Sequence, residues 1–153
     1  MPITRHPLYD DSRSSSPAPL DEGLVRRLEA SFHGFARSAD VLVERFYDRL
    51  FAREPRLRAM FPADLADQRR KLVSALAFVV KNLRSPEQVL PCLKELGASH
   101  AAFGARPAHY PIVCEELVAA MAETAAGAWN EEIEREWRSA LHLVSAAMLA
   151  GAA

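Results

Sequence analysis

The 153-residue sequence has few of the residues that would fix a fold or a site by covalent or metal chemistry. Its only cysteines are Cys92 and Cys114, too few for a disulfide framework and without the spacing of zinc ligands. Its six glycines are scattered and form no Gly-rich dinucleotide fingerprint, so no built-in reductase domain is expected. We interpret the two cysteines as unpaired thiols in a reducing compartment.

An excess of one charge and long apolar runs are also missing. The formal net charge is −1, which provides no electrostatic basis for binding nucleic acid or an anionic membrane. No apolar run reaches the length of a membrane span, and the first residues lack the apolar core of a signal peptide. We therefore expect a cytoplasmic protein without a nucleic-acid or membrane partner, either a monomer or a homodimer.

What the sequence does contain is enough apolar material for one core. Half of its residues are hydrophobic, which is ordinary for a globular domain of this length. Prolines and serines concentrate in residues 1–20, which we predict to be a mobile tail, and residues 21–153 to be a single domain. Beyond the tail the apolar pattern is helical and no run alternates as a strand would. The fold class expected is all-α, with six to eight helices.

Prolines and capping residues mark where these helices begin and end. Ser85 and Gln88 match a capping box, and Asn130 before two glutamates matches an N-cap. Pro91 lies inside its helix and predicts a kink there. The expected long helices begin near residues 21, 38, 63, 86, 107 and 131, with a short helical turn over 57–61.

One apolar stripe is interrupted by a single polar residue. Leu90, Leu93, Leu96, His100 and Phe103 are three or four residues apart and share one helix face. We therefore expect the His100 imidazole to face the interior. A core histidine bonded to a carbonyl is the commoner explanation, and a metal ligand is the alternative. The stripe alone does not choose between them.

Two more helices each direct an isolated polar group toward their apolar face. Tyr47 lies among Phe46, Leu50 and Phe51, and a buried tyrosine hydroxyl needs a partner. Gln68 is one turn before Leu72 on a face that continues to residue 79. Three such groups on three helices indicate one shared cavity with something polar at its centre.

At these residues the chain resembles the globin family, most closely the bacterial single-domain globins and the globin domain of flavohaemoglobins. The resemblance runs from about residue 24 to 148. It is carried by Phe46-Tyr47-Asp48-Arg49-Leu50-Phe51, Glu54-Pro55 with Phe61, Gln68-Arg69-Arg70-Lys71-Leu72, Leu96-Gly97-Ala98-Ser99-His100-Ala101-Ala102-Phe103-Gly104, and Pro107-Ala108-His109-Tyr110-Pro111. It implies a globin fold packed around a pocket for haem b, iron protoporphyrin IX.

The resemblance implies a role for each matching residue. His100 becomes the proximal iron ligand, with Tyr47 and Gln68 as the distal pair over the open iron position. The residues implied to contact the haem are Phe61, Lys71, Leu72, Leu96, Phe103 and Tyr110. In flavohaemoglobins a glutamate on the last helix joins the proximal tyrosine. We expect no equivalent here, because that position is counted to fall beyond Ala153.

The function implied is binding of oxygen, and of nitric oxide or carbon monoxide, at a five-coordinate iron. Tyrosine and glutamine side chains can donate hydrogen bonds to a ligand that carries negative charge. The same pair suits an enzyme, a nitric oxide dioxygenase that would depend on a separate reductase. A haem-based gas sensor is a further alternative. Oxygen transport and nitric oxide detoxification therefore both stay open as physiological roles.

Overall fold

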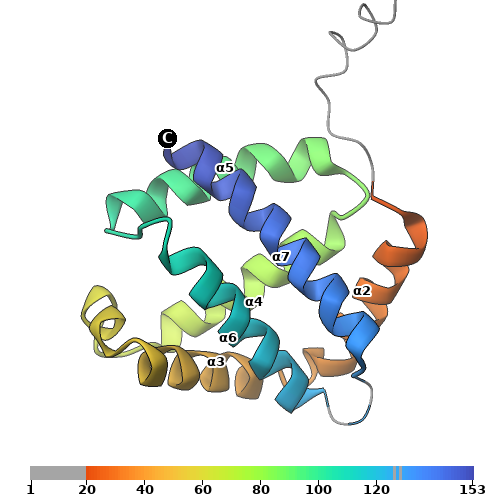
Figure 1. The fold of residues 1–153 in the computed structure, drawn as a ribbon, viewed down its shortest axis with the longest axis horizontal. Coiled ribbons are helices and arrows are strands. Elements are labelled where there is room, and N and C mark those ends of the chain that lie inside the picture. Colours follow the sequence, from red (N-terminus) through yellow and green to blue (C-terminus); the bar gives the residue numbers. More distant parts are fainter. Residues whose placement is uncertain (1–19, 126, 128) are drawn as a thin grey trace, which may run out of the picture.

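The computed structural model describes residues 20–125, 127 and 129–153, so the predicted mobile tail lies outside the described part except for Leu20. Every regular element within that part is helical, which confirms the all-α prediction. Figure 1 shows the helices crossing one another rather than running side by side as a regular bundle. They are α2 (Glu22–Ala36), α3 (Ala39–Arg53), the 3-10 helix η1 (Pro55–Met60), α4 (Ala66–Lys81), α5 (Pro86–Ala102), α6 (His109–Thr124) and α7 (Glu131–Ala152).

The capping predictions are confirmed at one helix and wrong at another. The Asn130 side chain accepts a hydrogen bond from the Ile133 backbone N–H at 2.8 Å and begins α7. Ser85 precedes α5, but its side chain makes no capping hydrogen bond. The helix also runs through Pro91 without a break. Pro91 has no N–H, so the helix lacks the hydrogen bond to the Glu87 carbonyl at this point.

Two helices begin later than predicted, at residue 66 instead of about 63 and at residue 109 instead of 107. Before the first of these two helices, the Arg58 guanidinium donates hydrogen bonds to backbone carbonyls of the corner. It donates to the backbone oxygens of Phe61, Pro62 and Ala63 at 3.3, 2.9 and 2.9 Å. The Asp64 side chain then accepts from the Ala66 N–H at 2.9 Å. These bonds hold residues 61–65 as an extended corner before α4.

The core has two parts that are nearly separate. The larger cluster joins α2, α3, η1, α4, α6 and the first half of α7. The smaller one joins α5 to the second half of α7 through Val89, Leu93, Ala147 and Met148. Val79 of α4 packs against both clusters. The proximal helix predicted from sequence, α5, is therefore attached to the molecule mainly through α7.

The contact between α5 and α7 depends on two glycines. A β-carbon at Gly97 would lie well within 3.0 Å of the Met148 carbonyl oxygen, and one at Gly151 equally close to the Lys94 carbonyl oxygen. Real β-carbons essentially never approach this closely. The backbones of the two helices thus touch at their crossing, which only glycine permits.

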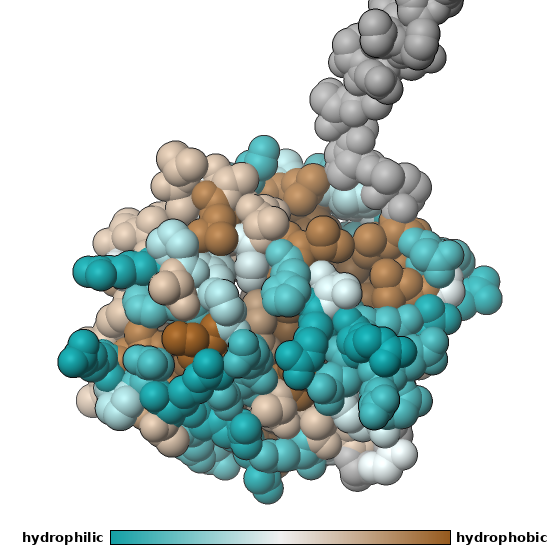
Figure 2. Space-filling model, viewed as in Figure 1, coloured by the Kyte–Doolittle hydropathy of each residue, from teal (hydrophilic) through white to brown (hydrophobic). Residues whose placement is uncertain are grey.

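Ion pairs tie the opposite side of the molecule together, between α3 and α6. Glu116 is buried, with its two carboxylate oxygens accepting from Arg49 at 2.9 Å and from Arg53 at 3.0 Å. A buried carboxylate is tolerated when it is paired in this way. Figure 2 shows mostly hydrophilic surface over the lower right of the molecule and more hydrophobic surface toward the top, where α5 and the end of α7 lie in Figure 1.

Helices α4 and α5 form a wedge that positions the candidate site. They are joined by the short corner between residues 81 and 86 and diverge from it, so their other ends are far apart (Figure 1). The two helices make little or no backbone contact with each other. Gln68 lies in the first turn of α4 and His100 in the last turn of α5, so both are at the open side of the wedge. Within the described residues, no helix is both long and apolar enough to cross a bilayer.

Candidate functional site

Tyr47 is held in α3 by aromatic packing. Its side chain is 4% exposed, and its ring centroid lies 4.8 Å from that of Phe46, 5.8 Å from Phe51 and 5.7 Å from Phe61. Offset and edge-to-face contacts of this kind are stabilising and restrict the ring. Phe46 and Phe51 come from the same helix, whereas Phe61 comes from the corner after η1. The phenol therefore has one defined orientation.

The structure brings Gln68 to this phenol. Burial raises the pKa of the Tyr47 hydroxyl, while a side-chain hydrogen bond with Gln68 and the charge of Arg69 act in the opposite direction. Gln68 is half-buried in the first turn of α4. Gln68 thus influences the pKa of the buried phenol from a separate helix.

Sequence reasoning missed the residue that fixes the corner beside this pair. Arg58 bonds the carbonyls of residues 61–63, and its guanidinium carbon also lies 5.3 Å from the centroid of the Phe51 ring. Phe51 and Phe61 pack edge to face at 5.3 Å, so Arg58 covers both the ring and the backbone of this aromatic group. A cation three residues before Phe61 was visible in the sequence, but the pattern did not indicate its partners.

His100 is held with one ring nitrogen bonded and the other free. Its Nδ1 lies 2.8 Å from the Leu96 carbonyl oxygen one turn earlier in α5. Because a carbonyl only accepts, Nδ1 carries the proton in this hydrogen bond, and in the neutral imidazole this leaves the lone pair on Nε2. A backbone carbonyl bonded to one nitrogen is the usual way in which a protein orients an imidazole that ligates metal through the other.

The expectation that the His100 side chain faces the protein interior is wrong, because the polypeptide does not bury it. Leu93 is buried and Leu96 is half-buried, but His100 is exposed and Phe103 is 80% exposed. The reason is the wedge: α7 covers the first part of the stripe, and no helix covers its last turn. An exposed phenylalanine beside a histidine leaves an apolar surface that the chain does not bury itself.

The other predicted contact residues fall into two groups. Phe61, Leu72 and Leu96 are half-buried at the margins of the two core clusters, and Lys71 is exposed on α4. Tyr110 packs against the smaller cluster at the start of α6, and burial alone raises the pKa of its hydroxyl.

Both cysteines are unpaired within the described residues. Cys92 is exposed on α5 and Cys114 is buried in α6. The Cys114 sulfur lies 3.3 Å from the Ser145 hydroxyl, and burial raises the pKa of the thiol. A buried neutral thiol of this kind is inert.

The available donors suit an iron whose other ligands come from a macrocycle. Among the described residues, no group of three His, Cys, Asp or Glu side chains could hold a metal ion. One imidazole with a free Nε2 does provide the axial ligand of a haem. The half-exposed apolar residues of α4 and α5 can contact the faces of a flat cofactor. The residues present therefore fit a haem.

A helical protein with one free imidazole on the open side of a wedge is of the kind that holds a planar cofactor between two helices. The family model described as Globin matches residues 44–148. The chain belongs to the globin family, and membership of this family implies haem as its cofactor.

The relatives similar in sequence are longer proteins. The chain is 32% identical over 111 residues to a flavohaemoprotein of Rhizobium meliloti (strain 1021), which covers 71% of this chain and 26% of the relative. It is 26% identical over 133 residues to a flavohaemoprotein of Bacillus subtilis (strain 168), covering 85% and 33%. The chain thus spans about a quarter to a third of the length of these relatives.

Solved structures show the same fold at lower identity. An engineered carbene transferase made from a candidate nitric oxide dioxygenase of Rhodothermus marinus has a TM-score of 0.78 at 24% identity, covering 87% of this chain and 93% of that one. A bacterial globin from Campylobacter jejuni has a TM-score of 0.76 at 18% identity, covering 86% and 96%. These similarities confirm the predicted globin fold.

Proposed function

We propose that the chain binds haem b in the wedge between α4 and α5, with His100 Nε2 as the iron ligand and small gases as its substrates or ligands. The observation that supports this proposal is the exposed His100 at the end of α5, oriented through its Nδ1, together with the buried Tyr47 and the half-buried Gln68 at the start of α4. A haem bound there supplies an iron with one position open to oxygen, nitric oxide or carbon monoxide. Phe61, Leu72, Leu96, Phe103 and Tyr110 contact it in this proposal, and Lys71 pairs with a propionate.

The distal pair then determines which ligand is favoured. Because burial raises the pKa of Tyr47, its hydroxyl stays protonated at neutral pH and donates a hydrogen bond. The Gln68 amide is a second donor beside it. Donors fixed in a dry pocket favour a ligand that carries negative charge, as oxygen does more than carbon monoxide. Tight oxygen binding is therefore the expected property.

Replacement of His100 tests the iron ligand. In His100→Ala the five-coordinate ferrous spectrum should be lost, because no other side chain replaces the imidazole, and added imidazole should restore it. His33→Ala is the matched control, because His33 is also exposed near the end of a helix. An unchanged ferrous spectrum in His100→Ala would assign the ligand to another residue, and no Soret band in the wild-type protein after haem addition would refute haem binding.

Replacement of Tyr47 tests the distal role. Tyr47→Phe keeps the ring packing and removes one hydrogen bond to a charged ligand, worth about 1.5–3 kcal/mol. The oxygen dissociation rate should rise about tenfold or more, since 1.4 kcal/mol corresponds to a factor of ten. Stopped-flow displacement of oxygen by carbon monoxide measures this rate. An unchanged rate would remove Tyr47 from the distal site.

Nitric oxide dioxygenation is the second candidate, because the chain is similar to flavohaemoproteins over most of its length. It would take place in the cytoplasm with a separate reductase that returns the iron to the ferrous state. Consumption of nitric oxide by the oxygenated protein distinguishes the candidates. Continuous turnover with a flavin reductase and NADH supports the enzyme, whereas a single stoichiometric burst under the same conditions supports binding alone. Gas sensing has no specific observation in its favour.

A further inference from the structure

The guanidinium of Arg58 joins three separate parts of the chain. It donates to the consecutive carbonyls of Phe61, Pro62 and Ala63 at 3.3, 2.9 and 2.9 Å. Its carbon also lies 5.3 Å from the centroid of the Phe51 ring, which belongs to α3. An arginine can make all these contacts because its planar group has several N–H donors at its edge and stacks on aromatic rings with its face. One half-buried side chain of η1 thus holds both α3 and the corner before α4.

The two aromatic residues that Arg58 holds are ones that pack against Tyr47. The Tyr47 ring centroid lies 5.8 Å from that of Phe51 and 5.7 Å from that of Phe61, and the last two are 5.3 Å apart. The three rings therefore contact one another mutually. Arg58 fixes Phe51 through its ring and Phe61 through its backbone. Because a ring in a close-packed site turns only when its neighbours give way, the orientation of the Tyr47 phenol depends on Arg58.

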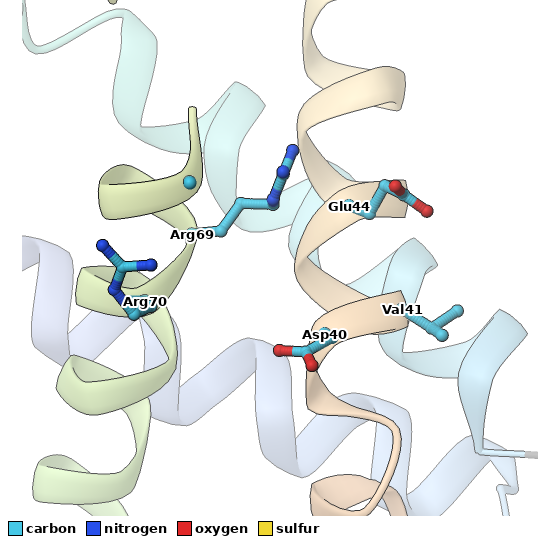
Figure 3. Close-up of a pocket in the computed structure, with 6 residues that line it drawn as sticks. Asp40, Val41, Glu44, Arg69 and Arg70 are labelled. Atoms are coloured by element: carbon cyan, nitrogen blue, oxygen red, sulfur yellow. The ribbon is translucent and has the colours of Figure 1, made fainter. Parts of the chain in front are cut away.

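Within the described residues, ion pairs do not fasten the first turn of α4 to α3. A pocket of about 340 Å³ lies between the two helices here, with the Asp40 carboxylate directed from α3 toward α4 and the Arg69 guanidinium between them (Figure 3). The arginines of α3 pair with glutamates of α6 instead, and Arg70 pairs with Asp67 of its own helix. The corner before α4 is therefore the part of the chain that sets where this turn, which carries Gln68, begins.

We propose that Arg58 is a positioning residue of the distal site, which holds the Tyr47 phenol through Phe51 and Phe61 and holds the turn of Gln68 through the corner before α4. Arg58 acts through these residues, without being assigned any contact with the ligand. The geometry of its planar group matters as well as its charge, because a lysine has one compact ammonium and cannot reach three carbonyls and a ring at once. The proposal rests on the proposed function, since it concerns the residues assigned there to the bound gas.

The mobility of the Tyr47 ring tests the hold directly. Arg58→Met keeps a side chain of similar length and removes every donor. In the diamagnetic carbon monoxide complex, tyrosine labelled with carbon-13 at Cε reports ring flips by NMR, and Tyr47→Phe identifies the signal. The flip rate of Tyr47 should rise about tenfold in Arg58→Met, the factor that corresponds to losing one hydrogen bond from a charged donor. Arg56→Met is the matched control, because Arg56 is exposed in the same 3-10 helix, and it should leave the flip rate unchanged.

The oxygen dissociation rate tests whether the hold matters to the ligand. Arg58→Met should raise this rate about tenfold, and Arg58→Lys should raise it less. In a Tyr47→Phe/Gln68→Leu background no distal donor is left to position, so Arg58→Met should change the rate by less than about twofold. Ser31→Ala controls for a general loss of stability, since it removes the acceptor of an indole N–H between α2 and α7, and it should leave the rate unchanged.

The proposal is overturned if Arg58→Met leaves the flip rate or the oxygen rate at the wild-type value, or if Arg56→Met or Ser31→Ala changes them equally. A full effect of Arg58→Met in the background without distal donors would also overturn it. If Arg58→Met does not fold, Arg58→Lys takes its place, and wild-type rates in that variant would refute the need for the planar group. If the wild-type protein forms no carbon monoxide complex, the proposed function fails instead. Ring flips in the protein as purified then still test whether Arg58 holds Tyr47.

Discussion

The crossing of α5 and α7 offers a sharp test of how the proximal helix is held. Replacing Gly97 with alanine places a β-carbon more than 1 Å inside the 3.0 Å limit from the Met148 carbonyl oxygen, and 2.6 Å from the Met148 Cα. The atoms it meets belong to the backbone of α7, which cannot rotate out of the way as a side chain could. The two helices must therefore separate by about 1 Å at this point.

The separation has a cost that can be estimated. Overpacking a core by one carbon costs about 1–3 kcal/mol, and a clash with backbone belongs at the upper end of that range. Val89, Leu93, Ala147 and Met148 form the small cluster at this crossing and lose contact together. At about 2–4 °C per kcal/mol for a protein of this size, a loss of 2–3 kcal/mol lowers Tm by roughly 4–12 °C.

The assay is thermal unfolding followed by circular dichroism, with Gly34→Ala as the control. A β-carbon at Gly34 meets no atom within 4 Å, so that substitution should stabilise α2 by about 0.5–1 kcal/mol. Because Gly97 is one turn before His100, Gly97→Ala should also release haem faster, measured by transfer to apomyoglobin. The reasoning is refuted if Gly97→Ala unfolds at or above the wild-type temperature.

Two other contacts predict the direction in which a substitution changes the stability of the fold. Trp137 is buried and its indole N–H donates to the Ser31 hydroxyl at 2.8 Å, so Ser31→Ala should cost about 1–3 kcal/mol in urea unfolding; wild-type stability would show that the indole finds another acceptor. Arg84 bonds Glu22 and Glu29 and thereby lowers the pKa of both carboxyls from 4.5. A carboxyl whose pKa is lowered by folding stabilises the folded state at a pH above its unfolded pKa. This stabilisation is lost as the pH falls through the folded pKa. The Tm difference between wild type and Arg84→Gln should therefore be present at pH 7 and shrink below pH 4.5; an equal difference at pH 3 would contradict this origin.

Much of the fold was predictable because it follows from local rules. Apolar spacing predicted each helix, and the Asn130 side chain caps α7 as its position before two glutamates indicated. The errors occurred where the partner of a side chain, rather than the spacing of apolar residues, decides the structure. The start of α4 depends on hydrogen bonds from Arg58 to the backbone carbonyls of the preceding corner. The spacing of apolar residues does not indicate which groups Arg58 binds.

The candidate site was predicted in part for the same reason. Tyr47 and Gln68 were expected to share a cavity because each is a polar group on an apolar face, and Gln68 is one of the groups that influence the pKa of Tyr47. The orientation of Tyr47 depends on Phe61 and on the corner held by Arg58, neither of which can be located by spacing along one helix. The role of Gly97 is also non-local, because it depends on a backbone more than fifty residues away in the chain.

The exposure of His100 shows what a helical stripe can establish. Spacing places Leu93, Leu96 and His100 on one face of α5, which ends at Ala102 with Phe103 as its C-cap. What covers that face is a separate question, decided by which helix packs against it. Because α7 covers the first part and α4 diverges from the last turn, the stripe ends at an exposed imidazole and a phenylalanine that is 80% exposed. An apolar stripe typical of buried residues that the chain leaves exposed is an argument for a non-protein group at this place. The free Nε2 of His100 makes a haem the group that fits.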